Sequence, residues 1–176
     1  MLKTPLAQAH KRLGAQMVNF GGWYMPVFYT NLIEEHQATR EKAGLFDICH
    51  MGEIKITGTK SQDLVQQLIT RNIDNMPIGK VYLSVICNEQ GGIIDDLTIY
   101  KIAEDEYMLV TNAGTKDKDF GQVLKVKKQL GLTDSEVKVS DISDKIAKLD
   151  LQGPNSKLIL KKICSADLDS LKFYRF

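Results

Sequence analysis

The sequence lacks several features that would each indicate a particular class of protein. Only three of its 176 residues are cysteines, and Cys49, Cys87 and Cys164 lie far apart without a C-x-x-C spacing, which argues against a disulfide framework or a cysteine zinc site. We therefore expect buried free thiols and a reducing compartment. No apolar run approaches the roughly 18 residues that a membrane-spanning helix needs. The first residues also lack the apolar stretch of a signal peptide, which favours a bacterial-type cytoplasm.

An excess of charge of one sign is also missing. Lys and Arg together number 23 and Asp and Glu number 22, which leaves a formal net charge of +1. This balance gives no electrostatic argument for binding nucleic acid or an anionic membrane. No phosphate-binding glycine loop or group of metal ligands occurs, so we expect no metal. His50 has no second ligand at a suitable spacing, and we interpret it as structural.

What the sequence does contain is typical of a folded domain, with 43% hydrophobic and 26% charged residues. Hydrophobic periodicity and breaker residues predict most of the elements after the first thirty residues. Asn31 is a suitable cap for the first clear helix, and Pro154 fits the first turn of the last one. The expected helices cover residues 31–44, 61–72, 117–130 and 153–164, and the expected strands cover 53–57, 81–87, 93–102, 107–112, 136–143 and 145–152.

Three of these strands are neighbours in the chain. The connections "NEQGG" and "AEDE" are short enough for hairpins, which predicts an antiparallel meander over residues 81–112. Because several strands are hairpin neighbours, the pattern favours an α+β fold with packed helices over a doubly wound parallel sheet.

Two neighbouring carboxylates follow the glycine turn in "NEQGGIIDDLTIYK". Side chains alternate along a strand, so Asp96, Thr98 and Tyr100 share one face, and Asp95 shares the other with the apolar Leu97. The face that carries Asp96 suits either solvent or a ligand. The residues alone leave both interpretations open, because aspartate beside a turn is common.

Four motifs in order, "FGGWYMPVFY", "EEHQATREKAGLFDICHMGEIKITG", "NEQGGIIDDLTIY" and "LQGPNS", carry a family resemblance over essentially the whole chain. Together they resemble the tetrahydrofolate-dependent aminomethyltransferases, the T-proteins of the glycine cleavage system, in their N-terminal half. The resemblance implies the first two lobes of a three-lobed cloverleaf. Residues 1–48 with 145–176 would form part of an incomplete first lobe, and residues 49–144 would form the second.

The same resemblance implies a site. Asp96 would be the chief catalytic residue, and Asp95 would have a structural role on the other face. Contacts to the co-substrate tetrahydrofolate are implied for Met51, Thr98, Tyr100, Val110 and Asn112.

The family reaction moves a methylene group from the aminomethyl-lipoyl arm of a partner, H-protein, to tetrahydrofolate, and ammonia is released. A fixed carboxylate such as Asp96 would orient the folate nitrogen and stabilise developing positive charge. Two alternatives share the fold: a non-catalytic folate-binding relative of the iron–sulfur maturation type, and a folate-dependent demethylase lobe.

The sequence also departs from the family pattern. Family members are about twice as long, and the later "GYTGE"-like glutamate and a late arginine are absent. We therefore expect the isolated chain to have weak or no activity and to expose apolar surface that favours self-association. The order "YLS" reverses Tyr82 and Leu83 relative to the pattern, and Thr98 stands where an aliphatic residue is usual.

Three further features receive structural interpretations. We place His10 in a surface segment without a role, and Trp23 with its aromatic neighbours in a cluster packed against the first helix. The basic run "KVKK", residues 125–128, is interpreted as a solvated helix face, with docking of an acidic partner such as H-protein as the alternative.

Overall fold

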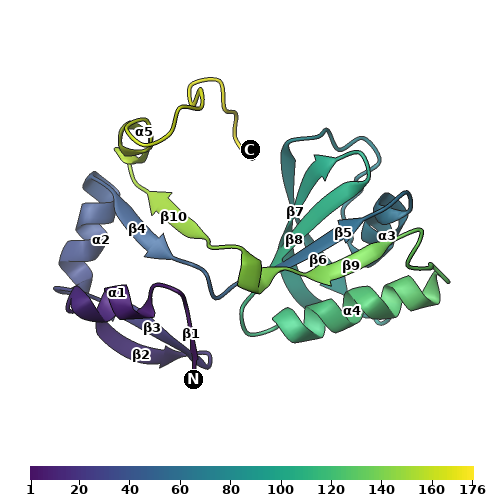
Figure 1. Ribbon diagram of the computed structural model, residues 1–176, viewed down its shortest axis with the longest axis horizontal. Helices are drawn as coiled ribbons and strands as arrows, with labels where there is room; N and C mark the ends of the chain where they lie inside the picture. Colours follow the sequence, from purple (N-terminus) through teal and green to yellow (C-terminus); the bar gives the residue numbers. More distant parts are fainter. The chain divides into compact units, whose positions relative to one another are not determined.

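The computed structural model describes residues 1–176 and divides the chain into two compact units (Figure 1). The first unit comprises Met1–His50 and Ala147–Leu171, and the second comprises Met51–Ile146 and Lys172–Phe176. Each unit therefore contains segments that are distant in the sequence.

The first unit contains two small sheets and three helices. In the three-stranded sheet, of order β1-β3-β2, the outer strand β1 is parallel to β3 and β2 is antiparallel to it. The second sheet pairs β4 with β10 in antiparallel register. The elements are β1 (Leu2–Lys3), α1 (Ala7–Arg12), β2 (Gln16–Phe20), β3 (Trp23–Phe28), α2 (Leu32–Glu41), β4 (Gly44–Asp47), β10 (Leu149–Gln152) and α5 (Ser156–Leu160).

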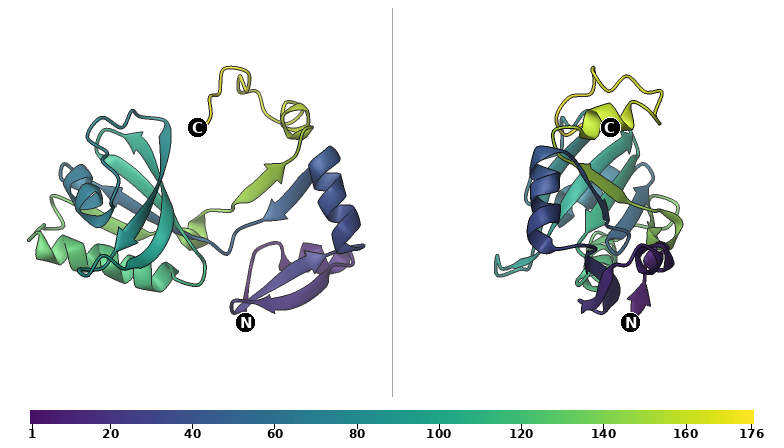
Figure 2. Two further views of the ribbon diagram at one scale, coloured as in Figure 1. Left: turned by 180° about the vertical axis from the view of Figure 1, so that it is seen from behind. Right: turned by 90° about the vertical axis from the view of Figure 1, so that its left-hand side faces the viewer.

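The second unit is built on a five-stranded sheet of order β6-β7-β8-β5-β9, in which every neighbouring pair is antiparallel. Strands β6, β7 and β8 form the expected meander and run side by side in both views (Figures 1 and 2). The elements are β5 (Gly52–Thr57), α3 (Ser61–Leu68), β6 (Lys80–Cys87), β7 (Ile93–Ala103), β8 (Glu106–Thr111), α4 (Lys116–Gln129), β9 (Lys138–Asp141) and the 3-10 turn η1 (Ser143–Lys145).

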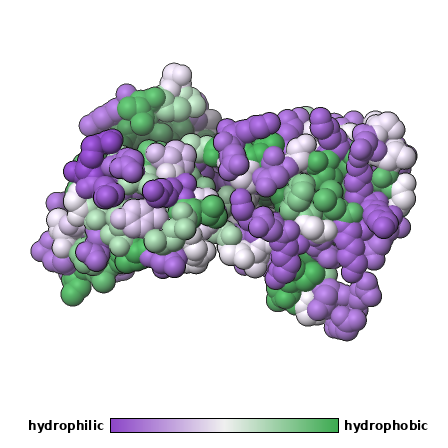
Figure 3. Space-filling view, turned by 60° about the horizontal axis from the view of Figure 1, so that its bottom comes forward, coloured by the Kyte–Doolittle hydropathy of each residue, from purple (hydrophilic) through white to green (hydrophobic).

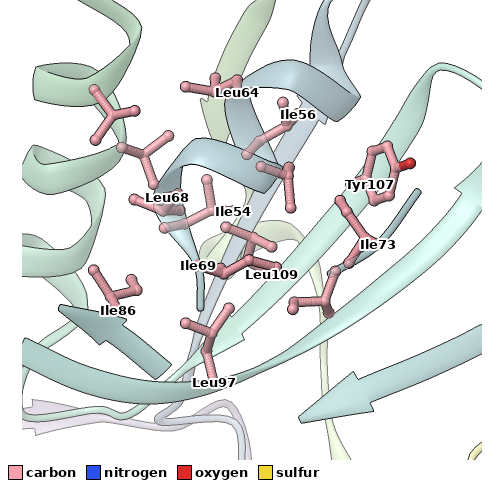
Figure 4. Close-up of a cluster of buried hydrophobic side chains, with 14 of the residues drawn as sticks. Ile54, Ile56, Leu64, Leu68, Ile69, Ile73, Ile86, Leu97, Tyr107 and Leu109 are labelled. Atoms are coloured by element: carbon pink, nitrogen blue, oxygen red, sulfur yellow. The ribbon is translucent and has the colours of Figure 1, made fainter. Parts of the chain in front are cut away.

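The core of the second unit lies between one face of this sheet and helices α3 and α4. Alternate residues of the strands, such as Ile99 and Leu109, are fully buried against Leu64 of α3 and Val123 of α4. Figure 4 shows core side chains such as Leu97 and Leu109 of the strands and Leu64 and Leu68 of α3 gathered in one cluster. At about 25 cal/mol for each Å² of apolar surface removed from water, burial of this kind is the main stabilising contribution to the unit.

The predicted α+β class with an antiparallel sheet is confirmed, and the deviations are mostly at element ends. The side chain of Asn31 caps α2 as expected by accepting from the backbone N–H groups of Ile33 and Glu34. That helix stops at Glu41, however, because Gly44 is already the first residue of β4. The last helix is shorter than predicted, and Pro154 precedes its first residue, Ser156.

Hydrophobic residues remain on the surface among hydrophilic ones, as the space-filling view shows (Figure 3). Ile163 and Phe173 are more than four-fifths exposed, and α5 contains no buried residue. No helix is both long enough and apolar enough to cross a membrane.

Two isoleucines on β7 provide a matched test of the core. Ile99 is fully buried, whereas Ile93 at the start of the same strand is 68% exposed. We expect Ile99→Ala to lower the free energy of unfolding by about 2–5 kcal/mol, because it removes buried methyl groups and leaves a cavity. Ile93→Ala should change it by less than about 0.5 kcal/mol. Urea denaturation of both variants measures the difference, and equal losses would contradict this description of the core.

Candidate functional site

The residues predicted to meet a ligand lie on the sheet face opposite the helices. Asp96, Thr98 and Tyr100 alternate along β7, and Thr98 pairs with Val110 on β8. Asp96 is exposed, Thr98 and Tyr100 are half-buried, and Val110 is buried. The structure therefore brings these four residues to one surface of a stiff hairpin, which is a suitable support for a binding site.

Asn112 follows the last residue of β8 and joins the two aspartates. Its side-chain amide donates to Oδ1 of Asp96 at 3.1 Å and to Oδ1 of Asp95 at 3.0 Å. The exposed carboxylate of Asp96 is thus held by a single donor, and its other oxygen receives no hydrogen bond from the protein. That oxygen is available to a ligand.

Asp95 occupies the opposite, helix-covered face, as the alternation predicts. Its Oδ2 accepts a hydrogen bond of 2.5 Å from the hydroxyl of Thr115, the residue before α4, and a longer one of 3.4 Å from the backbone N–H of Asn112. Burial alone would raise the pKa of Asp95, but the hydrogen bonds from Thr115, Asn112 and Asp119 outweigh it and lower the pKa below its ordinary value. Asp95 is therefore a charged group that fastens the hairpin to the start of α4.

A third carboxyl group, Asp119 on α4, completes this cluster. Its side chain is fully buried near Asp95, and neither of its oxygens has a hydrogen-bond partner in ordinary geometry. Burial, together with the neighbouring Asp95 carboxylate, raises the pKa of Asp119 from 3.8 to about 7. Asp119 was not among the site residues predicted from the sequence. The available signal was an acid on the apolar face of a helix, four residues before the buried Val123.

Met51 and Gly52 lead into the sheet beside this cluster. Gly52 pairs with Thr111, and a Cβ atom at Gly52 would lie 2.6 Å from the Thr111 hydroxyl and 2.8 Å from Cβ of Lys116. Only glycine allows the start of α4 to approach β5 this closely. Met51, the residue before it, is half-buried.

The reversed order of Tyr82 and Leu83 has a visible consequence on β6. Leu83 pairs with Thr98 on the face that carries Asp96 and is 49% exposed. Tyr82 packs against the helix-side core, with the Arg71 guanidinium 3.8 Å from its ring centre. The face that carries Asp96 therefore has a leucine at this place.

The other candidate residues are mostly structural, but two expectations were wrong. His10 is buried, not on the surface: its Nε2 lies 2.9 Å from Asp47 and its Nδ1 lies 2.7 Å from the Tyr29 hydroxyl. Within "KVKK", Lys127 is buried and pairs with Asp134, so this run is not one solvated face.

The remaining candidates are partly buried. His50 makes edge contacts with Phe20 and Trp23, and burial lowers its pKa. Of the cysteines, Cys49 is buried as expected, whereas Cys87 and Cys164 are only half-buried.

Two surface hollows do not coincide with the predicted residues. One, of about 630 Å³, lies in the first unit between α2, β3 and β4 and is lined by residues such as Tyr29, His36 and Phe46. The other, of about 570 Å³, lies beside α4 in the second unit. Neither is lined by Asp96, whose side chain is exposed on the sheet face opposite the helices.

Comparison with known proteins agrees with the fold and with the family resemblance. The family model described as "GCVT N-terminal domain" matches residues 6–176. An aminomethyltransferase from Halothermothrix orenii is 47% identical over the whole chain, which corresponds to 48% of that protein. The glycine cleavage system aminomethyltransferase T from Bartonella henselae superposes with a TM-score of 0.90 at 33% identity, covering 98% of this chain and 46% of that one.

A more distant structure shares the fold alone. Heterotetrameric sarcosine oxidase from Corynebacterium sp. U-96 superposes with a TM-score of 0.51 at 15% identity over 77% of this chain and 64% of that one. The fold and the family match define a protein of the aminomethyltransferase type. The chain belongs to the GcvT family as its N-terminal domain, and it spans about half the length of the curated relative it matches.

The paired carboxyls predict a pH-dependent contribution to stability. Because the folded-state pKa of Asp119 is raised, the folded state retains a proton between pH 3.8 and about 7 that the unfolded state releases. The contribution of Asp119 is therefore most favourable below pH 4 and is lost as the pH rises to 7, with a slope of up to about 1.4 kcal/mol per pH unit. We expect Asp119→Asn to abolish this slope, because asparagine keeps the hydrogen-bond donor without the ionisation.

The measurement is the difference in free energy of unfolding between parent and variant at several pH values from 4 to 8. Taking the difference removes the contribution of His50, whose lowered pKa acts in the opposite direction below pH 6.5. Asp117→Asn, an exposed aspartate in the same first turn of α4, is the matched control. A pH-independent difference for Asp119→Asn would contradict the assigned protonation.

Proposed function

We propose that this chain provides the folate-facing domain of a tetrahydrofolate-dependent aminomethyltransferase of the glycine cleavage system. The reaction transfers a methylene group from the aminomethyl-lipoyl arm of H-protein to tetrahydrofolate and releases ammonia. The two units would correspond to the first lobe, incomplete here, and the second lobe of the cloverleaf. The observation that carries the proposal is the exposed Asp96 carboxylate, which is oriented by Asn112 on the open face of the sheet.

The residues of this face fit a folate group. Asp96 offers a free acceptor oxygen for an N–H of the ligand, and Thr98 provides a small polar group beside it. Tyr100 presents an aromatic ring that also contacts Phe176, with 5.4 Å between ring centres. Val110 and Met51 add apolar surface. A flat heteroaromatic ligand with several N–H donors matches this mixture of aromatic, apolar and carboxylate groups.

The proposed methylene transfer depends more on stabilising positive charge than on transferring a proton. Tetrahydrofolate supplies the nitrogen nucleophile, and the carbon it receives carries partial positive charge as ammonia departs. Asp96 would stabilise that charge and orient the folate nitrogen, since a fixed carboxylate that needs no reorganisation is most effective in such a step. Asn112 would keep the carboxylate in place.

We expect Asp96→Asn to weaken the binding of tetrahydrofolate by tenfold or more, because a hydrogen bond to a charged group is worth about 1.5–3 kcal/mol. Isothermal titration calorimetry of the chain with tetrahydrofolate measures this effect. Asp105→Asn, an exposed aspartate in the β7–β8 turn at the other end of the hairpin, is the control and should bind as the parent does.

Circular dichroism spectra of each variant establish that it is folded. Equal affinity of parent and Asp96→Asn would exclude the proposed role of Asp96. Absence of binding by a folded parent would show that these residues are not sufficient to hold the folate.

A further inference from the structure

The buried carboxyl of Asp119 has no ordinary structural partner. The residue is fully buried, and no N–H or O–H group of the protein donates to either of its oxygens in normal hydrogen-bond geometry. The nearby hydroxyl of Thr115 donates to Asp95 instead. An ionised carboxylate without a donor is costly in such a place, whereas a carboxylic acid can donate its own proton.

The acceptor for that proton is the Asp95 carboxylate. Asp119 lies one helical turn after Thr115, which donates to Asp95, so the two carboxyl groups are neighbours; such a pair retains one proton between them because two negative charges would repel. Asp95 already accepts from Thr115 and Asn112, so it is the member that stays charged. The remaining O–H group therefore belongs to Asp119.

The other charged groups around α4 are engaged elsewhere. Lys118 on the same helix donates to the backbone carbonyl of Ile94 and only modestly favours ionisation of Asp119. Asp63 on α3 is paired with Lys60. On β9, Asp141 accepts from Ser143, and Lys138 acts on Asp134.

The hydrogen bonds continue from Asp95 to the open face of the sheet. The same amide nitrogen of Asn112 that donates to Asp95 also donates to Asp96. We propose that Asp119 is a positioning residue for Asp96. Asp119 donates a hydrogen bond that fixes Asp95, and Asp95 in turn fixes the Asn112 amide that orients Asp96.

We call this series of contacts, from Asp119 through Asp95 and Asn112 to Asp96, the relay. It makes the orientation of the Asp96 carboxylate depend on the proton of Asp119. When Asp119 loses it, the hydrogen bond becomes a repulsion between two carboxylates, and Asp95 must move away from α4. Asn112, which is bonded to Asp95, then loses its fixed orientation toward Asp96. The inference rests on the proposed function only for the role of Asp96 toward folate, because the relay itself is independent of any ligand.

Nuclear magnetic resonance of the side-chain amide of Asn112 tests the relay directly. We expect its signals to shift between pH 5 and 8.5 with a midpoint near 7, in step with the carboxyl carbon of Asp119. The histidine nearest to the cluster in the sequence is His50, two residues before Gly52; burial lowers its pKa below 6.5, so a midpoint near 7 would not be its own. A Cys87→Ser background removes the one thiol of the unit.

Two substitutions of Asp119 distinguish the effect of its hydrogen-bond donor from the effect of its negative charge. In Asp119→Asn the amide donates at every pH, so the Asn112 signals should stay at their low-pH position. In Asp119→Ala the donor is missing, and the signals should stay displaced at every pH. Asp117→Asn should titrate as the parent does. An Asn112 amide that does not move in the parent, or that moves equally in Asp119→Asn, would overturn the proposal even if Asp119→Ala fails to fold.

Affinity for tetrahydrofolate provides the functional readout. We expect binding to weaken several-fold between pH 6 and 8.5 in the parent and to be nearly constant in Asp119→Asn, whereas a purely structural Asp119 would leave the pH profile unchanged by that substitution. If the folded parent does not bind folate at all, the residues of this chain are not sufficient to hold it, and the resonance titration alone then decides whether Asp119 positions Asn112.

Discussion

The alternation of side chains along β7 gives two adjacent aspartates opposite environments, and the arrangement of the site depends on this separation. Asp95 enters the helix-covered face and meets the start of α4, while Asp96 emerges on the open face. A shift of one residue in the pairing of β7 would exchange them and would also expose Leu97 and Ile99. The apolar residues of β7 therefore determine on which face Asp96, the catalytic candidate, lies.

The same separation explains why the cluster tolerates so much negative charge. Asp95 is stabilised by the Thr115 hydroxyl and lies at the positive end of the α4 dipole. Asp119 stays neutral over much of the accessible pH range. Asp96 is solvated. Three carboxyl groups thus share a small region because each meets a different physical condition, which is how environments direct chemically identical acids to different roles.

Much of this arrangement followed from the sequence, because it depended on local rules. The meander, the cap at Asn31 and the division between Asp95 and Asp96 follow from hairpin length, side-chain hydrogen bonding and strand period. The contacts that join distant segments could not be predicted from the sequence. The pairing of His10 with Asp47 and that of Asp119 with Asp95 link residues 37 and 24 positions apart, so no periodicity reports them. The first strands were missed because β1 has two residues, both exposed, and β2 is short and mostly exposed.

The fold alone carries little information about chemistry here, since a sarcosine oxidase shares it at 15% identity. What distinguishes one member from another must lie in side chains such as those around Asp96. Asp119 is informative here because its burial is unfavourable for the stability of the folded state. A buried acid with a raised pKa destabilises the folded state at neutral pH relative to an apolar residue of similar size. Removing a destabilising feature often costs function where an active site depends on it. The instability of the buried pair is therefore consistent with a role at the open face, to which the Asn112 amide connects it.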